Sequence, residues 1–343
     1  GEDIDQPVPK ELLSLSGHSC KMVSLGAVHS LALNRGGDSV YAWGTGHATG
    51  LFPNSEHAVQ ATPAKIVPPG DPQALEQHLY RCTIVAVFAG DSHSLALQSN
   101  GHLYGWGLSQ GGRLGKMDES MVNGEHATVN CPTFILDTGY PPEPEEDDLS
   151  DKAEGDDASA SLIQGGPVEI SCGSMHSAAL TARSEIYSWG SNEYGQTGTD
   201  QDGISLDDMT WEPTIVQLST GKVTNLVCGE DFCLAASEGR VWAWGRNHKG
   251  QLGIGHLSPG KHFESHPVQL KGLSGVKFLA AGEDHSAAIL DSGELYTWGS
   301  TEHGKLGQGS SAVGGCQDFP RALDIRERLV GVSCGEQHTA IVS

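Results

Sequence analysis

Residues 90–107 read GDSHSLALQSNGHLYGWG, and the pattern of this stretch returns along the chain. Its opening, G-x-x-H-[ST], occurs at 26–30, 90–94, 173–177, 282–286 and 335–339, and a sixth copy at Gly229 carries Phe232 instead of histidine. A Trp-Gly pair follows the matching glycine after 15 to 17 residues, at Trp43, Trp106, Trp189, Trp244 and Trp298. A third mark, the pattern G-x-x-G, comes next at 112–115, 195–198, 250–253 and 304–307. The first unit matches this pattern only in part, at Gly50-Leu51-Phe52. Marks that recur in order at a nearly fixed spacing indicate a repeat architecture.

Within each unit the residue pattern is typical of β-strands. Residues 93–97 and 102–106 flank Asn100-Gly101, a pair suited to a tight hairpin turn because both residues tolerate positive φ. In 294–298 large and small side chains alternate, which suits sheets packed face to face. No stretch is typical of a long helix. The sequence therefore predicts an all-β fold of antiparallel sheets.

Two links between units carry insertions. The unit glycines lie 64, 83, 56, 53 and 53 residues apart, and the longer links contain the polar segments 68–77 and 140–166. Between Pro141 and Asp157 nine acids and one lysine give a charge of −8. Such a composition buries too little apolar surface to offset the entropy of ordering. We expect a single domain over 1–343 with a disordered acidic insertion at about 140–166.

Composition excludes several classes of function. The chain has 343 residues, 46 glycines and a net charge of −23, so direct binding to nucleic-acid phosphate is not expected, whereas this charge is compatible with a basic protein partner. It has no long apolar run and its start does not resemble a signal peptide, so we expect no membrane association. Eight cysteines without a C-x-x-C pair favour an intracellular protein, cytoplasmic or nuclear, with reduced thiols.

The three marks together resemble the repeat of the regulator of chromosome condensation family. The resemblance covers nearly the whole chain and implies a β-propeller of four-stranded antiparallel blades, seven being the family norm. It also implies functions that include nucleotide exchange on the small GTPase Ran, ubiquitin-ligase scaffolding, ciliary complexes and plant UV-B sensing. Here six first marks and five second marks are recognisable. The ring either closes with fewer blades or receives another blade from residues outside the chain.

Repeated residues have plain structural roles in this interpretation. Equivalent histidines of different blades lie far apart around a propeller axis, whereas a zinc ion needs its ligands at about 2.0 to 2.3 Å, so we expect no metal site and backbone hydrogen bonds inside each blade instead. The cysteines before the unit glycines are expected to be small packing residues, and the tryptophans of the second mark to be core. The sequence contains no phosphate-binding loop, zinc-protease helix or nucleophile elbow, and we expect no cofactor.

The two residues between glycine and histidine of each first mark are the candidate site, because they should lie in loops on one rim. Four of the six loops carry acids, and the candidate rim residues are Asp91, Glu230, Asp231, Glu283, Asp284 and Glu336. Gly90-Asp91-Ser92-His93 matches the motif of family members that exchange nucleotide on Ran, so the resemblance makes Asp91 the candidate exchange residue. The alternative is that these acids only cap turns and keep the rim solvated.

Two functions follow from this interpretation. The first is a non-catalytic platform that recruits another protein through rim loops. The second is a guanine-nucleotide exchange factor for a Ran-type GTPase, which would work without a cofactor of its own.

Overall fold

The computed structural model describes residues 11–51, 58–67, 79–80, 82–115, 128–137, 167–199, 209–218, 220–255, 261–309 and 315–343. The predicted acidic insertion at 140–166 and segment 68–77 lie outside these residues. The described chain is built from antiparallel sheets, and its helical segments are the short turns η1 (Leu13–Leu15), α1 (Gly46–Thr49), η2 (Gln110–Gly112) and η3 (Glu302–Gly304). None of the helices found in the described residues is long and apolar enough to span a bilayer.

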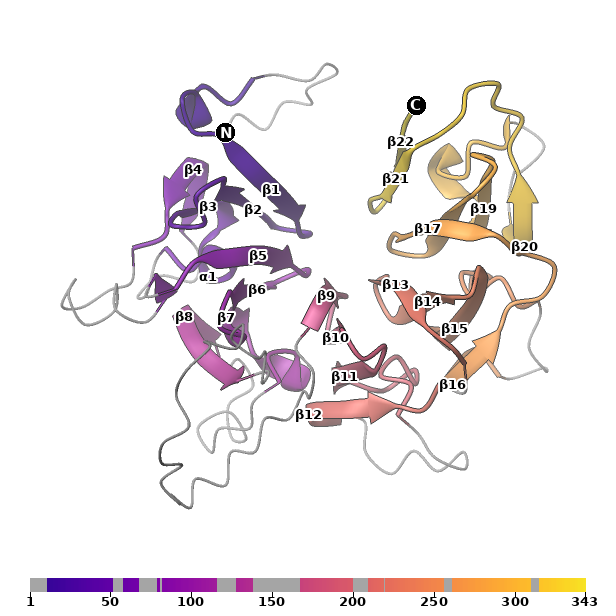
Figure 1. Cartoon of the computed structure of the whole chain (residues 1–343), viewed down its shortest axis with the longest axis horizontal. Helices are drawn as coiled ribbons and strands as arrows, with labels where there is room; N and C mark the ends of the chain where they lie inside the picture. The colour runs from indigo at the N-terminus through magenta and orange to yellow at the C-terminus, as the bar shows by residue number, and fades with distance from the viewer. Residues whose placement is uncertain are drawn as a thin grey trace, which may run out of the picture. The chain divides into compact units, whose positions relative to one another are not determined.

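Each repeat of the sequence forms one sheet whose strands pair in chain order (Figure 1). Sheet 1 holds β1 (Cys20–Leu25), β2 (His29–Asn34), β3 (Val40–Thr45) and β4 (Val59–Lys65), and sheet 2 holds β5 (Ile84–Ala89), β6 (His93–Gln98), β7 (His102–Leu108) and β8 (Thr128–Asp137). Sheet 3 holds β9 (Pro167–Cys172), β10 (His176–Thr181), β11 (Ile186–Ser191) and β12 (Met209–Val216). Sheet 4 holds β13 (Val223–Cys228), β14 (Phe232–Ser237), β15 (Arg240–Arg246) and β16 (Phe263–Gln269).

Sheet 5 holds β17 (Val276–Ala281), β18 (His285–Leu290), β19 (Leu295–Ser300) and β20 (Cys316–Ala322). Sheet 6 consists, within the described residues, of β21 (Gly331–Cys334) and β22 (Thr339–Val342). The expected four-stranded antiparallel sheets are confirmed. The first mark forms the turn between the first two strands of a sheet, and the Trp-Gly pair lies near the end of the third.

The chain divides into two compact units. The first unit contains sheets 1 and 2, and the second contains segment 111–117 together with sheets 3 to 6. In the first unit Leu31, Ile84 and Trp106 belong to one buried core. In the second unit a core that includes Leu234, Leu252 and Trp298 joins sheet 4 to sheet 5. Apolar side chains of consecutive sheets therefore form the cores, as face-to-face packing requires.

The Trp-Gly pair interrupts the regular pairing of the third strand with the fourth. In sheet 5 the register shifts between Thr297 and Gly299, and the corresponding shift occurs in the other four-stranded sheets. Gly299 has a φ of 104°, which side-chain-bearing residues rarely adopt. A bulge of this kind redirects a side chain, and Trp298 is 0% exposed. The prediction that the second-mark tryptophans are core residues is confirmed for Trp106, Trp189, Trp244 and Trp298, while Trp43 is partly exposed.

Candidate functional site

The histidine of the first mark reaches the next repeat. His29 Nε2 lies 2.7 Å from Ser94 Oγ, and His285 Nε2 lies 2.9 Å from Thr339 Oγ1. The partner in both cases is the Ser or Thr that follows the next first-mark histidine. We expected these histidines to bond the backbone inside their own blade, and that expectation was wrong for this ring nitrogen. A cross-repeat partner explains why the hydroxyl residue follows the histidine in the motif.

The tryptophan and the hydroxyl residue of one repeat share an acceptor in the preceding repeat. Trp298 Nε1 donates to the carbonyl of Gln251 at 2.9 Å, and Ser286 Oγ donates to the same carbonyl at 2.8 Å. The same arrangement recurs with Trp106 and Ser94 on Ala48, Trp189 and Ser177 on Arg113, and Trp244 and Cys233 on Gln196. All three marks therefore describe one contact, which we call the joint between consecutive repeats.

The joint locates the third mark of the first repeat. Ala48 provides the carbonyl there, and the indole of Trp106 lies against Gly50, the position of the last glycine in the other copies. The mark is therefore at 47–50, and our placement at Gly50-Leu51-Phe52 was wrong. The α1 turn hides it, because His47 replaces the first glycine of the pattern.

First-mark glycines are required by close packing on two sides. A Cβ at Gly282 would lie 2.5 Å from the ring of its own His285 and 2.3 Å from the carbonyl oxygen of Gly335 in the next repeat. Real Cβ atoms do not approach backbone that closely, so only glycine fits. Successive first-mark loops are thereby brought into direct contact.

Backbone hydrogen bonds connect the first-mark loops of the second unit. The amide of Ser174 donates to the carbonyl of Glu230 at 2.9 Å, and the amide of Glu230 donates to the carbonyl of Glu283 at 3.4 Å. The amide of Glu283 donates to the carbonyl of Gly335 at 3.4 Å, directly before Glu336. Glu230 and Glu283 are partly exposed and Glu336 is exposed. We call Glu230, Glu283 and Glu336 the acidic edge.

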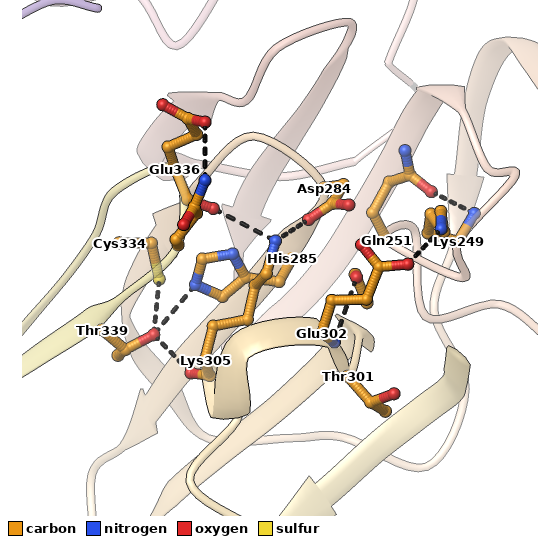
Figure 2. A network of polar contacts seen from close by, with 12 residues as sticks. Lys249, Gln251, Asp284, His285, Thr301, Glu302, Lys305, Cys334, Glu336 and Thr339 are labelled. Atoms are coloured by element: carbon orange, nitrogen blue, oxygen red, sulfur yellow. Dashed lines mark hydrogen bonds and ion pairs between the residues drawn. The ribbon is translucent and has the colours of Figure 1, made fainter. Parts of the chain in front are cut away.

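Two of the loops have a second acid, Asp231 or Asp284, which is buried and paired with a cation. Asp231 accepts a hydrogen bond from Arg246 at 3.1 Å. Asp284 accepts one from Lys305 Nζ at 2.5 Å, and the same ammonium group donates to the carbonyl of Glu336 at 3.1 Å (Figure 2). Asp231 is 9% and Asp284 7% exposed, so neither carboxylate faces solvent fully. These two aspartates stabilise the loops, and the glutamates of the acidic edge are more accessible.

Cations also flank the acidic edge at the surface. Lys249 Nζ lies 2.9 Å from Glu302, and this hydrogen bond lowers the pKa of Glu302 (Figure 2). Arg246 lies 4.5 Å from the ring centroid of Tyr194, in cation–π contact. The surroundings of the edge are therefore of mixed charge.

Asp91 belongs to the first unit. It lies partly buried in the turn between β5 and β6, where its backbone carbonyl accepts a hydrogen bond from the ring of His29. Burial lowers the pKa of His29 to about 4, and the bond to Asp91 opposes that shift. The structure thus brings Glu230, Glu283 and Glu336 together within one unit and places Asp91 in the other.

Sequence reasoning missed one buried cluster. His176 Nε2 lies 3.2 Å from Cys233 Sγ, which in turn lies 3.2 Å from Cys228 Sγ. The sequence feature that could have indicated this cluster is Cys233, which occupies the Ser or Thr position in the one first mark without histidine.

Comparison with known sequences places the chain in a family. The RCC1-like domain matches residues 1–341. Human E3 ubiquitin-protein ligase HERC2 is 28% identical over 97% of this chain, which spans 6% of that ligase. Ultraviolet-B receptor UVR8 of Arabidopsis thaliana is 28% identical over 100% of this chain and 67% of the receptor. The mitochondrial RCC1 domain-containing protein RUG3 of the same plant is 30% identical over 84% of this chain and 56% of its own length.

Solved structures support the same fold. Human WBSCR16 superposes with a TM-score of 0.60 at 21% identity, covering 94% of this chain and 86% of that one. Prp20p from Saccharomyces cerevisiae superposes with a TM-score of 0.54 at 20% identity, covering 94% and 82%. The repeated joints, the four-stranded sheets and these likenesses agree, and the chain belongs to the RCC1-like domain family of β-propeller proteins.

Proposed function

We propose that the chain is a non-catalytic protein-interaction platform whose contact surface includes the acidic edge. The observation that carries the proposal is the backbone connection of the loops bearing Glu230, Glu283 and Glu336. The loops are held in place by the joints and by the buried pair of Asp284 with Lys305. A rigid row of carboxylates binds a partner without a large ordering cost.

Charge indicates the kind of partner. The chain carries a net charge of −23, so a basic protein surface would be attracted to it and steered towards the acidic edge. Prp20p binds Gsp1p and histones, and we propose that this chain likewise takes a basic protein partner. An intracellular site of action, cytoplasmic or nuclear, belongs to the proposal because all eight cysteines are free thiols in the structure.

Core histones are a suitable basic probe for the test. Their affinity is measured by calorimetry for the wild type and for the triple variant Glu230→Gln, Glu283→Gln and Glu336→Gln. The matched control is Glu212→Gln, Asp324→Asn and Glu327→Gln, which removes three exposed carboxylates of the same unit. We expect the edge variant to bind at least about tenfold more weakly and with a smaller salt dependence. Equal affinities for the edge variant and the wild type would contradict the proposal.

Nucleotide exchange on a Ran-type GTPase is the second candidate. The match of Gly90-Asp91-Ser92-His93 favours it, and Prp20p binds Gsp1p. In this case the wild type speeds release of labelled GDP, and Asp91→Ala slows that release at least about tenfold, since about 1.4 kcal/mol of lost transition-state stabilisation gives this factor. Glu11→Gln, an exposed carboxylate of the same unit, is the control. If the wild-type protein does not speed the release of labelled GDP, exchange activity on the GTPase tested is ruled out.

A further inference from the structure

The joint between sheets 3 and 4 differs from the others in its chemistry. Ser94 and Thr339 meet the histidine of the preceding repeat with a hydroxyl, whereas Cys233 meets His176 with a thiol. Directly before the unit glycine, where sheets 2 and 5 have alanine, sheet 4 has Cys228. This joint therefore combines an imidazole with two sulfur atoms.

The three donors lie close enough to share one ion. His176 Nε2 and Cys228 Sγ each lie near Cys233 Sγ, at 3.2 Å in both cases, and all three atoms lie within 4.8 Å of one another. They come from the start of β10, the end of β13 and the start of β14. All three residues are buried, so the ion would be acquired during folding or a local opening of the joint.

The donor atoms of the cluster suit a soft cation, because two of the three are sulfur atoms. An ion that binds here displaces the thiol protons of Cys228 and Cys233, because thiolate is the form that coordinates metals.

We propose that His176, Cys228 and Cys233 form a binding site for one Cu⁺ ion. Thiolate ligands favour soft ions such as Cu⁺, and imidazole is a compatible third ligand. With metal–ligand distances of about 2.3 Å, three-coordinate geometry separates the ligand atoms by about 4 Å, so the two short contacts need to open by less than about 1 Å. Structural Zn²⁺ sites use four ligands, and this set offers three.

Other repeats supply substitutions that the joint tolerates. Cys233→Ser restores the hydroxyl found at Ser94 and Ser286, and Cys228→Ala restores the alanine found at Ala89 and Ala281. The double variant removes both sulfur ligands and keeps the histidine contact of an ordinary joint. The control is Cys20→Ser with Cys316→Ser, which removes two thiols outside the cluster.

The test refolds reduced protein without oxygen in the presence of one equivalent of Cu⁺ and then challenges it with a chromogenic Cu⁺ chelator. We expect the wild type and the control to retain one Cu⁺ and to melt about 5 °C higher than without metal, whereas the double variant retains none and does not shift. X-ray absorption of the loaded wild type should show two sulfur ligands and one nitrogen, a result that does not depend on how any variant folds.

Three results would overturn the proposal. The first is equal copper retention by the double variant and the wild type, which would place the ion at other thiols. The second is loss of copper from every protein in the chelator challenge. The third is tighter retention of Zn²⁺ than of Cu⁺ in parallel samples, which would show that the ion was wrongly assigned.

Discussion

Trp298 donates its indole N–H to the backbone carbonyl of Gln251 at 2.9 Å, across 47 residues of sequence. Gln251 belongs to the loop after the third strand of sheet 4, and Trp298 to the third strand of sheet 5. Because the indole is 0% exposed, its truncation both empties core volume and removes a donor from a buried carbonyl.

We expect Trp298→Ala to lower the free energy of unfolding by about 3 to 5 kcal/mol, as for other large core aromatics. Trp43→Ala changes the same repeat position where the side chain is partly exposed, and it should cost less. Urea denaturation of both variants measures the difference. A loss below about 1 kcal/mol for Trp298→Ala would contradict the core assignment.

The glycine after the tryptophan is expected to resist substitution more than a glycine of similar φ elsewhere. At Gly299, with φ of 104°, a Cβ would lie 2.6 Å from the carbonyl oxygen of Asp284. Gly272 has φ of 80°, and a Cβ there would have nothing within 4 Å. Gly272→Ala should therefore cost only the strain of the left-handed backbone, about 1 to 2 kcal/mol, and Gly299→Ala more than about 3 kcal/mol. Equal denaturation midpoints for the two variants would show that the close approach does not matter.

The pair of Lys305 with Asp284 is expected to behave as a buried ion pair. The side chains of Lys305 and Asp284 are 2% and 11% exposed. Lys305→Met leaves the buried carboxylate of Asp284 without a cation, and it should lower the free energy of unfolding by about 3 to 5 kcal/mol. The double variant with Asp284→Asn should recover part of that loss, because no unpaired charge remains. The exposed pair of Lys249 with Glu302 is the control, and Lys249→Met should leave the denaturation midpoint within error. A thermodynamic cycle without coupling between Lys305 and Asp284 would argue against the pairing.

Acid should weaken the joints through their histidines. Burial, with Lys305 as the next contributor, lowers the pKa of His285 from 6.5 to about 4. Below pH about 6.5 the unfolded chain therefore binds a proton that the folded chain excludes, and stability falls as the pH drops towards about 4 and then levels off. The slope approaches about 1.4 kcal/mol per pH unit for each excluded proton.

His285→Phe tests this dependence, because Phe232 already occupies the equivalent position. Unfolding free energies of the variant, measured from pH 7 to pH 4, should show a shallower slope than those of the wild type. Parallel curves would mean that another group causes the acid sensitivity.

The sequence predicted the sheets well because each mark lies in a fixed place along a repeat. It did not reveal the joints, since a joint's partners come from two repeats and the pairing of His29 with Ser94 depends on their packing in space. For the same reason Asp284 was expected on an exposed rim, although Lys305 covers it from a loop 21 residues later. The exposure of the glutamates of the acidic edge, by contrast, could be predicted from their position in the loops. The cluster at Cys233 escaped notice because its third member, His176, lies 57 residues away.

The shared carbonyl of each joint also bears on how such a chain can grow. One repeat carries the tryptophan and hydroxyl donors for the joint before it, and the carbonyl for the joint after it. A gene segment that encodes one repeat therefore encodes one full set of joint donors and one joint acceptor, wherever its boundaries are drawn. Tandem duplication of that segment creates a new joint that is complete from the start, without compensating mutations elsewhere.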